Sequence, residues 1–266
     1  MSVAAVAVLM GAGCKAVEPA PADVDGLAHY FWDGFDDESE ETLLPNGIVN
    51  LHDALDADTI EEAFDGTITD LNGEQLALVG KDDLDPADPA GVFMANVINC
   101  GLDDVEASAY ALDQMAIHPG IYEDYSRVYT TDFDAYIDRQ ARFLGWETDY
   151  FVDGFGATYS AIIDGTMRYI PEVDAELSPH GPAVITRGVL REAAYIEGSD
   201  KQRGLMQDYQ LEIFYERAPG ETVHFYVMWR DMVYAADTTF DSETMQRLVL
   251  NSLVDWDEEI EDYCGQ

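Results

Sequence analysis

The chain has 266 residues, of which 54 are acidic and 13 are basic, so its formal net charge is −41. This charge argues against nucleic acid as a partner, because binding there depends on neutralising phosphates with lysine and arginine. It argues equally against docking on anionic lipid head groups. Hydrophobic residues make up 47% of the chain, enough to bury a sizeable core, so the composition is not that of a disordered protein.

The chain opens on an uncharged, mostly apolar run, residues 1–13. The run is too short to span a bilayer, which needs about 20 apolar residues. Its length is typical of the apolar region of a signal peptide. We therefore expect residues 1–13 to be a signal peptide. The alternative is an ordinary buried segment.

The run is followed by Gly11-Ala12-Gly13-Cys14, which resembles the lipobox of bacterial lipoproteins. In that family small residues precede a cysteine that is acylated and becomes the new N-terminus. Gly11 stands where the family usually has leucine, and no Lys or Arg lies near Met1. The resemblance implies lipid attachment at Cys14. Because Lys15 is not the Asp that marks inner-membrane retention, it also implies an outer-membrane anchor facing the periplasm or the exterior. A cleaved signal without lipid is the alternative.

Residues 14–24 are rich in proline and alanine and lack periodicity, which indicates a flexible tether. From residue 25 to residue 145 we expect an acidic and mostly helical region. The predicted helices come from capping residues, helical spacing of apolar positions and terminal glycines. They cover residues 27–35, 59–64 and 89–100, a longer helix after Asp103 or Asp104, and one from Thr131 or Asp132 to Gly145.

From Trp146 onward the pattern indicates β-strands. Residues 157–163 and 166–171 flank Asp164-Gly165, a strong hairpin signal. Residues 183–196 form a third extended region, and residues 207–217 and 222–234 form a second predicted hairpin. A helix from residue 242 to residue 263 closes the chain, with Leu253, Trp256 and Ile260 on its apolar stripe and Asp257 outside it.

These elements predict an α+β fold: a helical N-terminal half, then a four- to five-stranded antiparallel sheet packed against a long C-terminal helix in residues 146–266. Residues 25–266 are expected to form one compact unit. The order of elements after residue 146 is loosely similar to that of helix-grip folds. That resemblance implies a curved sheet that wraps the last helix and encloses an apolar cavity.

Apart from Cys14, the chain has two cysteines, Cys100 and Cys264. In an exported protein an even pair is most simply one disulfide, which here ties the end of the chain to its first half. Two buried free thiols are the alternative.

We find no H-E-x-x-H pair, nucleophile elbow, P-loop or G-x-G-x-x-G sequence. The sequence therefore predicts no catalytic residue, metal site or cofactor. The five histidines are interpreted as partly exposed or capping residues. Asp-rich stretches at residues 70–74 and 82–88 allow weak Ca²⁺ binding, but neither has the register of an EF-hand, and solvated acidic loops are the alternative.

Arginines and aromatic residues alternate along the predicted strands. On a curved sheet they could line a concave surface that binds an anionic or amphipathic ligand. Alternatively, the arginines pair with carboxylates and the aromatic rings form the core. The candidate ligand-lining residues are Arg168, Arg187, Arg191, Arg230, Tyr209, Tyr226 and Trp229.

The sequence thus favours an exported, lipid-anchored envelope protein with a binding or scaffolding role for an unknown protein or small-molecule ligand, rather than an enzyme. One alternative is a carrier of an apolar or amphipathic ligand in a helix-grip cavity. Another is a secreted hydrolase that uses two carboxylates, since 54 acidic residues offer many pairs.

Overall fold

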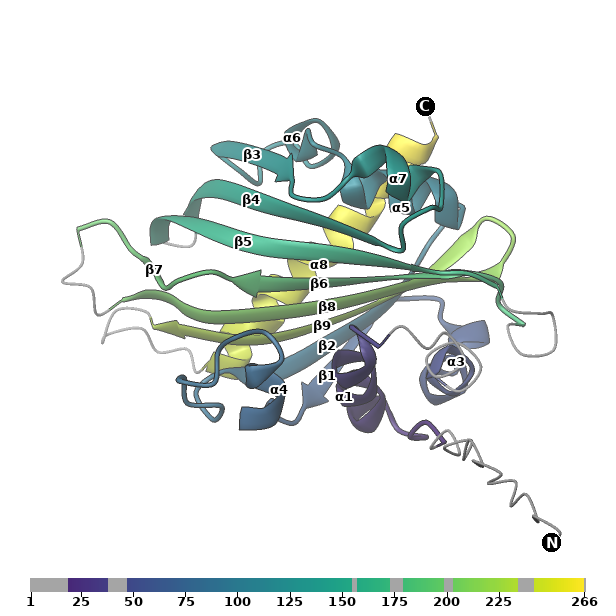
Figure 1. Cartoon of the computed structure of the whole chain (residues 1–266), viewed down its shortest axis with the longest axis horizontal. Coiled ribbons are helices and arrows are strands. Elements are labelled where there is room, and N and C mark those ends of the chain that lie inside the picture. The colour runs from purple at the N-terminus through teal and green to yellow at the C-terminus, as the bar shows by residue number, and fades with distance from the viewer. Residues whose placement is uncertain are drawn as a thin grey trace, which may run out of the picture.

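An antiparallel sheet organises the computed structural model, which describes residues 19–37, 47–154, 157–172, 179–198, 203–233 and 242–265 (Figure 1). Within these ranges the sheet has nine strands in the order β1-β2-β9-β8-β6-β5-β4-β3, with β7 paired to β8. The strands are β1 (Phe64–Ile68), β2 (Ala90–Ile98), β3 (Asp124–Tyr129), β4 (Phe143–Gly154), β5 (Ala157–Ile170), β6 (Ala183–Leu190), β7 (Ala194–Tyr195), β8 (Gly204–Ala218) and β9 (Glu221–Val233).

The helices are short except for the last one. They are α1 (Val24–Gly34), α3 (Val49–Leu55), the 3-10 helix η2 (Ala57–Thr59), α4 (Gly73–Ala77), α5 (Leu102–Tyr110), α6 (Gln114–Ile117), α7 (Phe133–Ile137) and α8 (Ser242–Cys264). In Figure 1, α8 (yellow) passes behind the strands, whereas α1, α3 and α4 lie in front of them. The two faces of the sheet are therefore covered by different parts of the chain.

The predicted fold class is wrong in two respects: the N-terminal half is not helical, and the sheet has nine described strands rather than four or five. Residues 89–100, expected as a helix, contain strand β2, which lies between β1 and β9. A strand covered on both faces is a nearly continuous apolar run, and such a run does not distinguish a strand from a buried helix. The helix expected over residues 132–144 is only the five-residue α7, because β4 begins at Phe143.

The hairpin predicted at Asp164-Gly165 is also wrong, because both residues lie inside the 14-residue strand β5. Gly165 pairs with Trp146 of β4. A Cβ atom at Gly165 would lie 2.1 Å from the indole Nε1 of Trp146. The glycine is thus required for close packing of an indole ring on the strand rather than for a turn.

The β8–β9 hairpin and the C-terminal helix are confirmed. The hairpin pairs Leu205–Ala218 with residues 221–232 and turns at Gly220, whose φ of 81° lies in the left-handed region that glycine adopts without strain. The α8 helix covers residues 242–264. The side chains of residues 242–249, 251 and 252 lie outside the described part. They include Met245, Leu248, Val249 and Ser252, which also belong to the predicted stripe of this helix.

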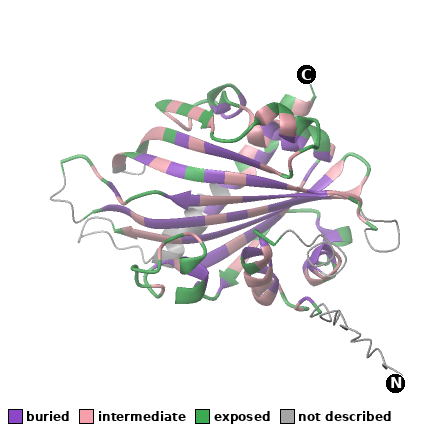
Figure 2. Cartoon of the chain, in the orientation of Figure 1, coloured by how far each residue is buried: buried purple, intermediate pink, exposed green. Residues whose placement is uncertain are grey.

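The larger core lies between the sheet and α1, α3 and α4. Trp32 of α1 packs edge-on against Trp229 of β9 and Tyr209 of β8, with ring centroids 5.4 and 6.1 Å apart. Trp32 and Trp229 are fully buried. Figure 2 shows that burial is concentrated in the central strands of the sheet. This face of the sheet is a conventional packed core.

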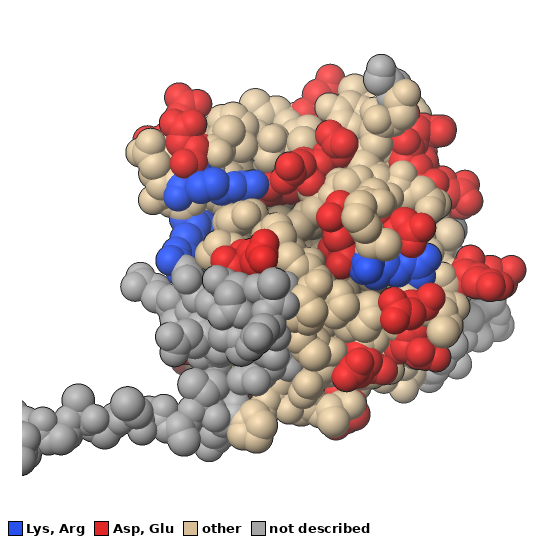
Figure 3. Space-filling model, turned by 90° about the vertical axis from the view of Figure 1, so that its right-hand side faces the viewer, with Lys and Arg blue, Asp and Glu red and all other residues tan. Residues whose placement is uncertain are grey.

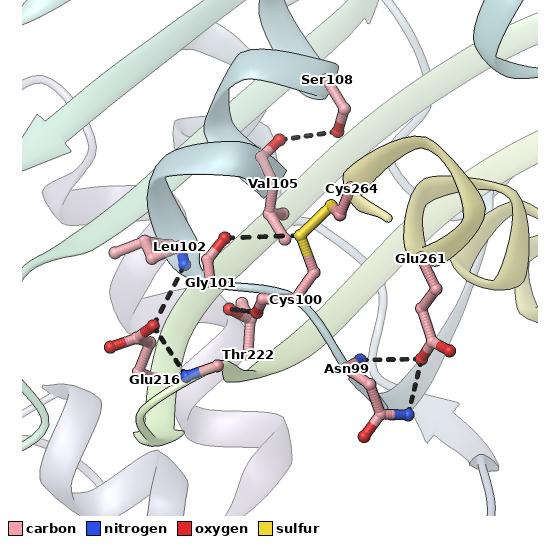
Figure 4. Close-up of a disulfide and its surroundings, with 11 residues drawn as sticks. Asn99, Cys100, Gly101, Leu102, Val105, Ser108, Glu216, Thr222, Glu261 and Cys264 are labelled. Atoms are coloured by element: carbon pink, nitrogen blue, oxygen red, sulfur yellow. Dashed lines mark hydrogen bonds between the residues drawn. A yellow bond between two sulfur atoms is a disulfide. The ribbon is translucent and has the colours of Figure 1, made fainter. Parts of the chain in front are cut away.

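The opposite face is covered by α8, with α5 and α6 in contact with it. Cys100 and Cys264 form a disulfide with a Cα–Cα distance of 6.1 Å, which fastens the end of α8 to the segment after β2 (Figure 4). Beside it, the Asn99 backbone N–H and side-chain amide both donate to Glu261 Oε1 at 2.7 and 2.9 Å. The C-terminal half of α8 is therefore held to the sheet by covalent and polar contacts.

Candidate functional site

The two faces of the β8–β9 hairpin differ in chemistry. Leu211, Ile213 and Val227 point into the packed core under α1 and are fully buried. The alternate positions, which face α8, include Asp208 and His224, which are 0% and 4% exposed. Burying charged groups where apolar side chains would fit costs free energy unless each charge has a partner. The face under α8 is therefore the better candidate for function.

A row of tyrosines crosses this face. Tyr122 precedes β3, and its ring centroid lies 4.8 Å from that of Tyr125, 5.6 Å from that of Tyr150 and 6.2 Å from that of Trp256 on α8. The Tyr150 ring on β4 lies 6.4 Å from that of Tyr159 on β5. Tyr226 of β9 belongs to a buried cluster against which Trp256 also packs. We call the surface formed by Tyr122, Tyr125, Tyr150, Tyr159 and Tyr226 the tyrosine recess.

Protein surrounds much of the tyrosine recess. Burial raises the pKa of Tyr122, and it raises the pKa values of Tyr150 and Tyr226 well above the ordinary tyrosine value. Yet Tyr122 and Tyr150 are only half-buried, so solvent reaches rings that protein surrounds. Among the described residues, no hydrogen bond involves the hydroxyl of Tyr122, Tyr150 or Tyr226. None of the three hydroxyls is among the buried side-chain atoms that lack a partner, so each of them has access to solvent.

An ion pair stands beside the tyrosines. Arg230 Nε and Nη2 donate to Asp208 Oδ1 and Oδ2 at 2.8 and 2.9 Å. Gln210 Nε2 donates to Asp208 Oδ2 at 2.7 Å. The pKa of Arg230 is well above its usual value, because the attraction of Asp208 outweighs the desolvation that opposes it. Both charges influence the pKa values of Tyr150 and Tyr226, so the pair adjoins the tyrosine recess.

His224 forms the centre of a second buried polar group. Its Nδ1 lies 2.8 Å from Asp257 Oδ1 of α8, and its Nε2 lies 3.3 Å from Glu212 Oε2 without hydrogen-bond geometry. Desolvation lowers the pKa of His224, but Asp257 and Glu212 outweigh it and raise the value to about 10. Asn96 Nδ2 donates to Asp257 Oδ2 at 2.8 Å. One carboxylate of α8 is thus bonded to two strands.

His118 and Trp256 border the recess on the side of α6. The two rings stack with centroids 5.1 Å apart, and His118 Nδ1 lies 2.8 Å from Glu259 Oε2 of α8. Desolvation lowers the pKa of His118 against the opposing effect of Glu259. At neutral pH the His118 imidazole beside the tyrosine recess is therefore neutral. The His224 imidazole, which is paired with Asp257, is charged.

The structure does not bring the seven candidate ligand-lining residues together. Arg230 and Tyr226 lie at the tyrosine recess, whereas Tyr209 and Trp229 belong to the core under α1. Arg168 donates to the carbonyls of Gly34 and Phe35. Arg187 pairs with Asp36, and Arg191 pairs with Glu147 and Asp164. The arginines thus do pair with neighbouring carboxylates and carbonyls, as the alternative interpretation expects, and a role in ligand binding stays a prediction.

Sequence reasoning missed Asp257 and His224. Asp257 is 1% exposed, although the helical pattern places it outside the apolar stripe with its acidic neighbours. His224 is interpreted from sequence as partly exposed, yet it is buried and paired. The one usable signal was the outer face of β9, where His224, Tyr226, Met228 and Arg230 are unusually large for a solvent-exposed side.

The predictions of metal binding and of cell location are not tested by the structure. No group of three metal-ligating side chains exists among the described residues, and weak Ca²⁺ binding stays a prediction. None of the described helices is both long enough and apolar enough to cross a membrane. Residues 1–18, with the predicted signal peptide and Cys14, lie outside the described part. Figure 3 shows a side of the molecule on which acidic side chains are widespread and basic ones few.

No protein-family profile and no curated protein sequence matches the chain. Several solved structures are similar in shape at low identity. They include a STAR-related lipid transfer protein from Xanthomonas axonopodis (9% identity, 67% of this chain and 88% of that chain, TM-score 0.44), a START superfamily protein from Mycobacterium smegmatis (7%, 66% and 97%, 0.41) and the Zhui aromatase/cyclase from a Streptomyces species (12%, 66% and 93%, 0.40).

Proposed function

We propose that the protein binds and carries a small amphipathic ligand in the tyrosine recess under α8. The observation that carries this proposal is the set of three phenolic hydroxyls, on Tyr122, Tyr150 and Tyr226, that have no hydrogen-bond partner among the described residues. Each of these hydroxyls has access to solvent, so a bound molecule can replace water as its hydrogen-bond acceptor. A ligand that accepts hydrogen bonds from these hydroxyls would satisfy them.

The recess sets the ligand's character. The tyrosine rings and Trp256 offer flat apolar surfaces, while the Arg230–Asp208 pair adds charge at one side. Aromatic faces stack on other rings in offset or edge-on geometry. Tyrosine hydroxyls are protonated at neutral pH and can donate, and burial raises the pKa values of Tyr150 and Tyr226 further. These properties favour a flat molecule with oxygen acceptors over a purely aliphatic chain.

The competing functions have less support. Asp208 and Asp257 are the most deeply buried carboxylates on this face, and each is paired with a cation, Arg230 or His224. A hydrolase with two carboxylates needs both groups to face substrate. A scaffolding role needs no recess. Lipid anchoring through Cys14 is compatible with a carrier and is proposed separately.

Binding of 2-naphthol and of naphthalene, measured by fluorescence titration, tests the proposal. A hydrogen bond contributes roughly 0.5 to 1.5 kcal/mol, so 2-naphthol should bind several-fold more tightly than naphthalene. Tyr150→Phe and Tyr226→Phe keep the rings and remove the donors, and the double variant should lose this preference. Tyr263→Phe, on the exposed end of α8, serves as the control and should keep it.

Two results would overturn the proposal. One is the absence of saturable binding by either probe to the folded wild-type protein. The other is an undiminished preference for 2-naphthol in the Tyr150→Phe, Tyr226→Phe double variant, which would place the probe elsewhere. Circular dichroism of each variant establishes that the fold is retained before affinities are compared.

A further inference from the structure

A second hollow lies on the opposite face of the sheet from the tyrosine recess. Its volume is about 280 Å³, and its walls include Lys81, Arg187, Arg191, Thr166 and one carboxylate, Asp164. The whole chain has only 13 basic residues against 54 acidic ones. Three basic side chains around one hollow are therefore a marked departure from the charge of the rest of the molecule.

Arg187 is the most deeply placed of the three. Its side chain is 10% exposed, and its guanidinium carbon lies 4.2 Å from the ring centroid of Phe35. Its Nη2 donates to both carboxylate oxygens of Asp36, at 3.0 and 2.8 Å. Its Nη1 is buried and makes no hydrogen bond to any residue in the described ranges. A buried cationic donor without an acceptor indicates that a further acceptor belongs beside it.

Lys81 and Arg191 close the rim of the hollow. Lys81 Nζ donates to the carbonyl oxygen of Arg191 at 2.6 Å, which leaves two of its three N–H groups for other acceptors. Arg191 contacts Glu147 at 2.6 Å and Asp164 at 2.5 Å, so it is held in position by two carboxylates. Arg191 therefore already balances the negative charge of Asp164. Asp36 compensates Arg187 in the same way, and Lys81 is the basic side chain of the hollow that has no ion pair among the described residues.

An adjoining hollow of about 340 Å³ shares Gly80 and Lys81 with the first one. Its walls include the apolar side chains of Leu84, Leu190 and Met206 and the ring of Tyr209, and also the carboxylates of Asp83 and Glu192. Lys81 therefore stands between a basic chamber and a partly apolar chamber. This arrangement fits a molecule with a charged oxygen group at one end and an apolar body at the other.

We propose that these two hollows form a binding site for a small organic anion, with its carboxylate or phosphate oxygens held by Lys81 and Arg187 and its body in the neighbouring chamber. Arg187 supplies a fixed planar donor, and Lys81 supplies a mobile ammonium. Thr166 offers a hydroxyl in the same wall. The site is separate from the tyrosine recess and does not depend on it.

Amide NMR titrations with acetate, benzoate and inorganic phosphate test the proposal, each against sodium chloride at equal ionic strength. We expect saturable shifts of the Gly80, Lys81 and Thr166 amides with benzoate or phosphate. Benzoate should bind more tightly than acetate if the apolar chamber takes the body. A stronger response to phosphate than to either carboxylate would assign the oxygens to a phosphate ester instead.

Lys81→Gln should weaken binding of the effective anion at least tenfold, and Arg191→Gln should weaken it less. Arg142→Gln removes one charge from an exposed arginine that lines neither hollow, so it should leave binding unchanged. If Lys81→Gln and Arg142→Gln lost equal affinity for the anion, the net charge of the protein would explain the binding, and the proposed site would be wrong. So would shifts no larger than those produced by chloride. Binding of 2-naphthol to Lys81→Gln should remain normal, which keeps the two sites distinguishable.

Discussion

His224 Nδ1 on β9 lies 2.8 Å from Asp257 Oδ1 on α8, and this contact joins the helix to the middle of the sheet. Both side chains are almost fully buried, at 5% and 2% exposed. Neither charge could be accommodated there without the other. This buried charge pair therefore contributes to the position of α8 over the tyrosine recess, together with Asn96, the Asn99–Glu261 contact and the disulfide.

Asp257→Asn should destabilise the protein by about 3 to 5 kcal/mol, because it leaves the His224 imidazole without its carboxylate in a buried site. Asp255→Asn, on an exposed position of the same helix, is the matched control and should change the stability little. Urea unfolding at neutral pH measures both. A loss for Asp257→Asn no greater than that for Asp255→Asn would show that the pair does not hold α8.

The same pair predicts a specific dependence of stability on alkaline pH. The pKa of His224 is raised in the folded state from 6.5 to about 10. A raised pKa contributes stability that is fully present below the unfolded value and is lost as pH rises through the folded value. We therefore expect the free energy of unfolding to fall between about pH 6.5 and pH 10.

His224→Gln should flatten that alkaline decline. His118→Gln should keep the decline, because burial lowers the pKa of His118 and its effect belongs to more acidic solution. Urea unfolding at a series of pH values gives the slopes. An alkaline decline of equal slope in His224→Gln and the wild type would assign it to other groups.

The cysteine pair, the β8–β9 hairpin and the final helix could be predicted from sequence because each depends on a local or exclusive signal: an even pair of thiols, strict alternation, and an amphipathic stripe. Strand β2 could not, since its apolar run is decided by the strands on both sides of it. The hairpin prediction at Gly165 is wrong because Asp164-Gly165 is a common turn sequence. The same two residues also fit a strand in which the glycine leaves room for the Trp146 ring.

The candidate site was less predictable than the fold. The arginine and aromatic pattern identified residues on both faces of the sheet, and spacing alone does not say which face a helix will cover. Tyr122, Tyr150 and Asp257 come from three distant segments that only the tertiary fold brings together. In a chain with 54 acidic residues, the buried carboxylates do not stand out from the exposed ones.

Loss of the disulfide should lower stability without unfolding the protein. The bond closes a loop of 164 residues, for which the chain-entropy model gives an upper value of about 4 to 5 kcal/mol. Asn99–Glu261 and His224–Asp257 still hold α8 when the bond is absent. The Cys100→Ser, Cys264→Ser double variant should therefore fold, with a lower thermal midpoint that reductant no longer changes. A wild-type midpoint that is itself insensitive to reductant would contradict this expectation.

The net charge predicts that salt stabilises the fold. Raising sodium chloride from 0.1 to 1 M shortens the screening length from about 10 Å to about 3 Å, which weakens repulsion among the acidic side chains. The thermal midpoint should therefore rise over this range. Chloride is the suitable anion because sulfate also strengthens apolar burial. A thermal midpoint that does not change with salt would show that repulsion among the acidic side chains does not destabilise the fold.

Membrane attachment through Cys14 is tested by fractionating a Gram-negative host that expresses the full chain. A body with a net charge of −41 gains nothing from anionic head groups, so acyl chains on Cys14 would be its means of attachment. Cys14→Ala should move the protein from the membrane fraction to the soluble fraction. Lys15→Asp should keep it membrane-bound but shift it from the outer to the inner membrane, as the lipobox resemblance implies. A wild-type protein found in the soluble fraction would contradict lipid attachment at Cys14. A Cys14→Ala variant that still sediments with membranes would contradict it too.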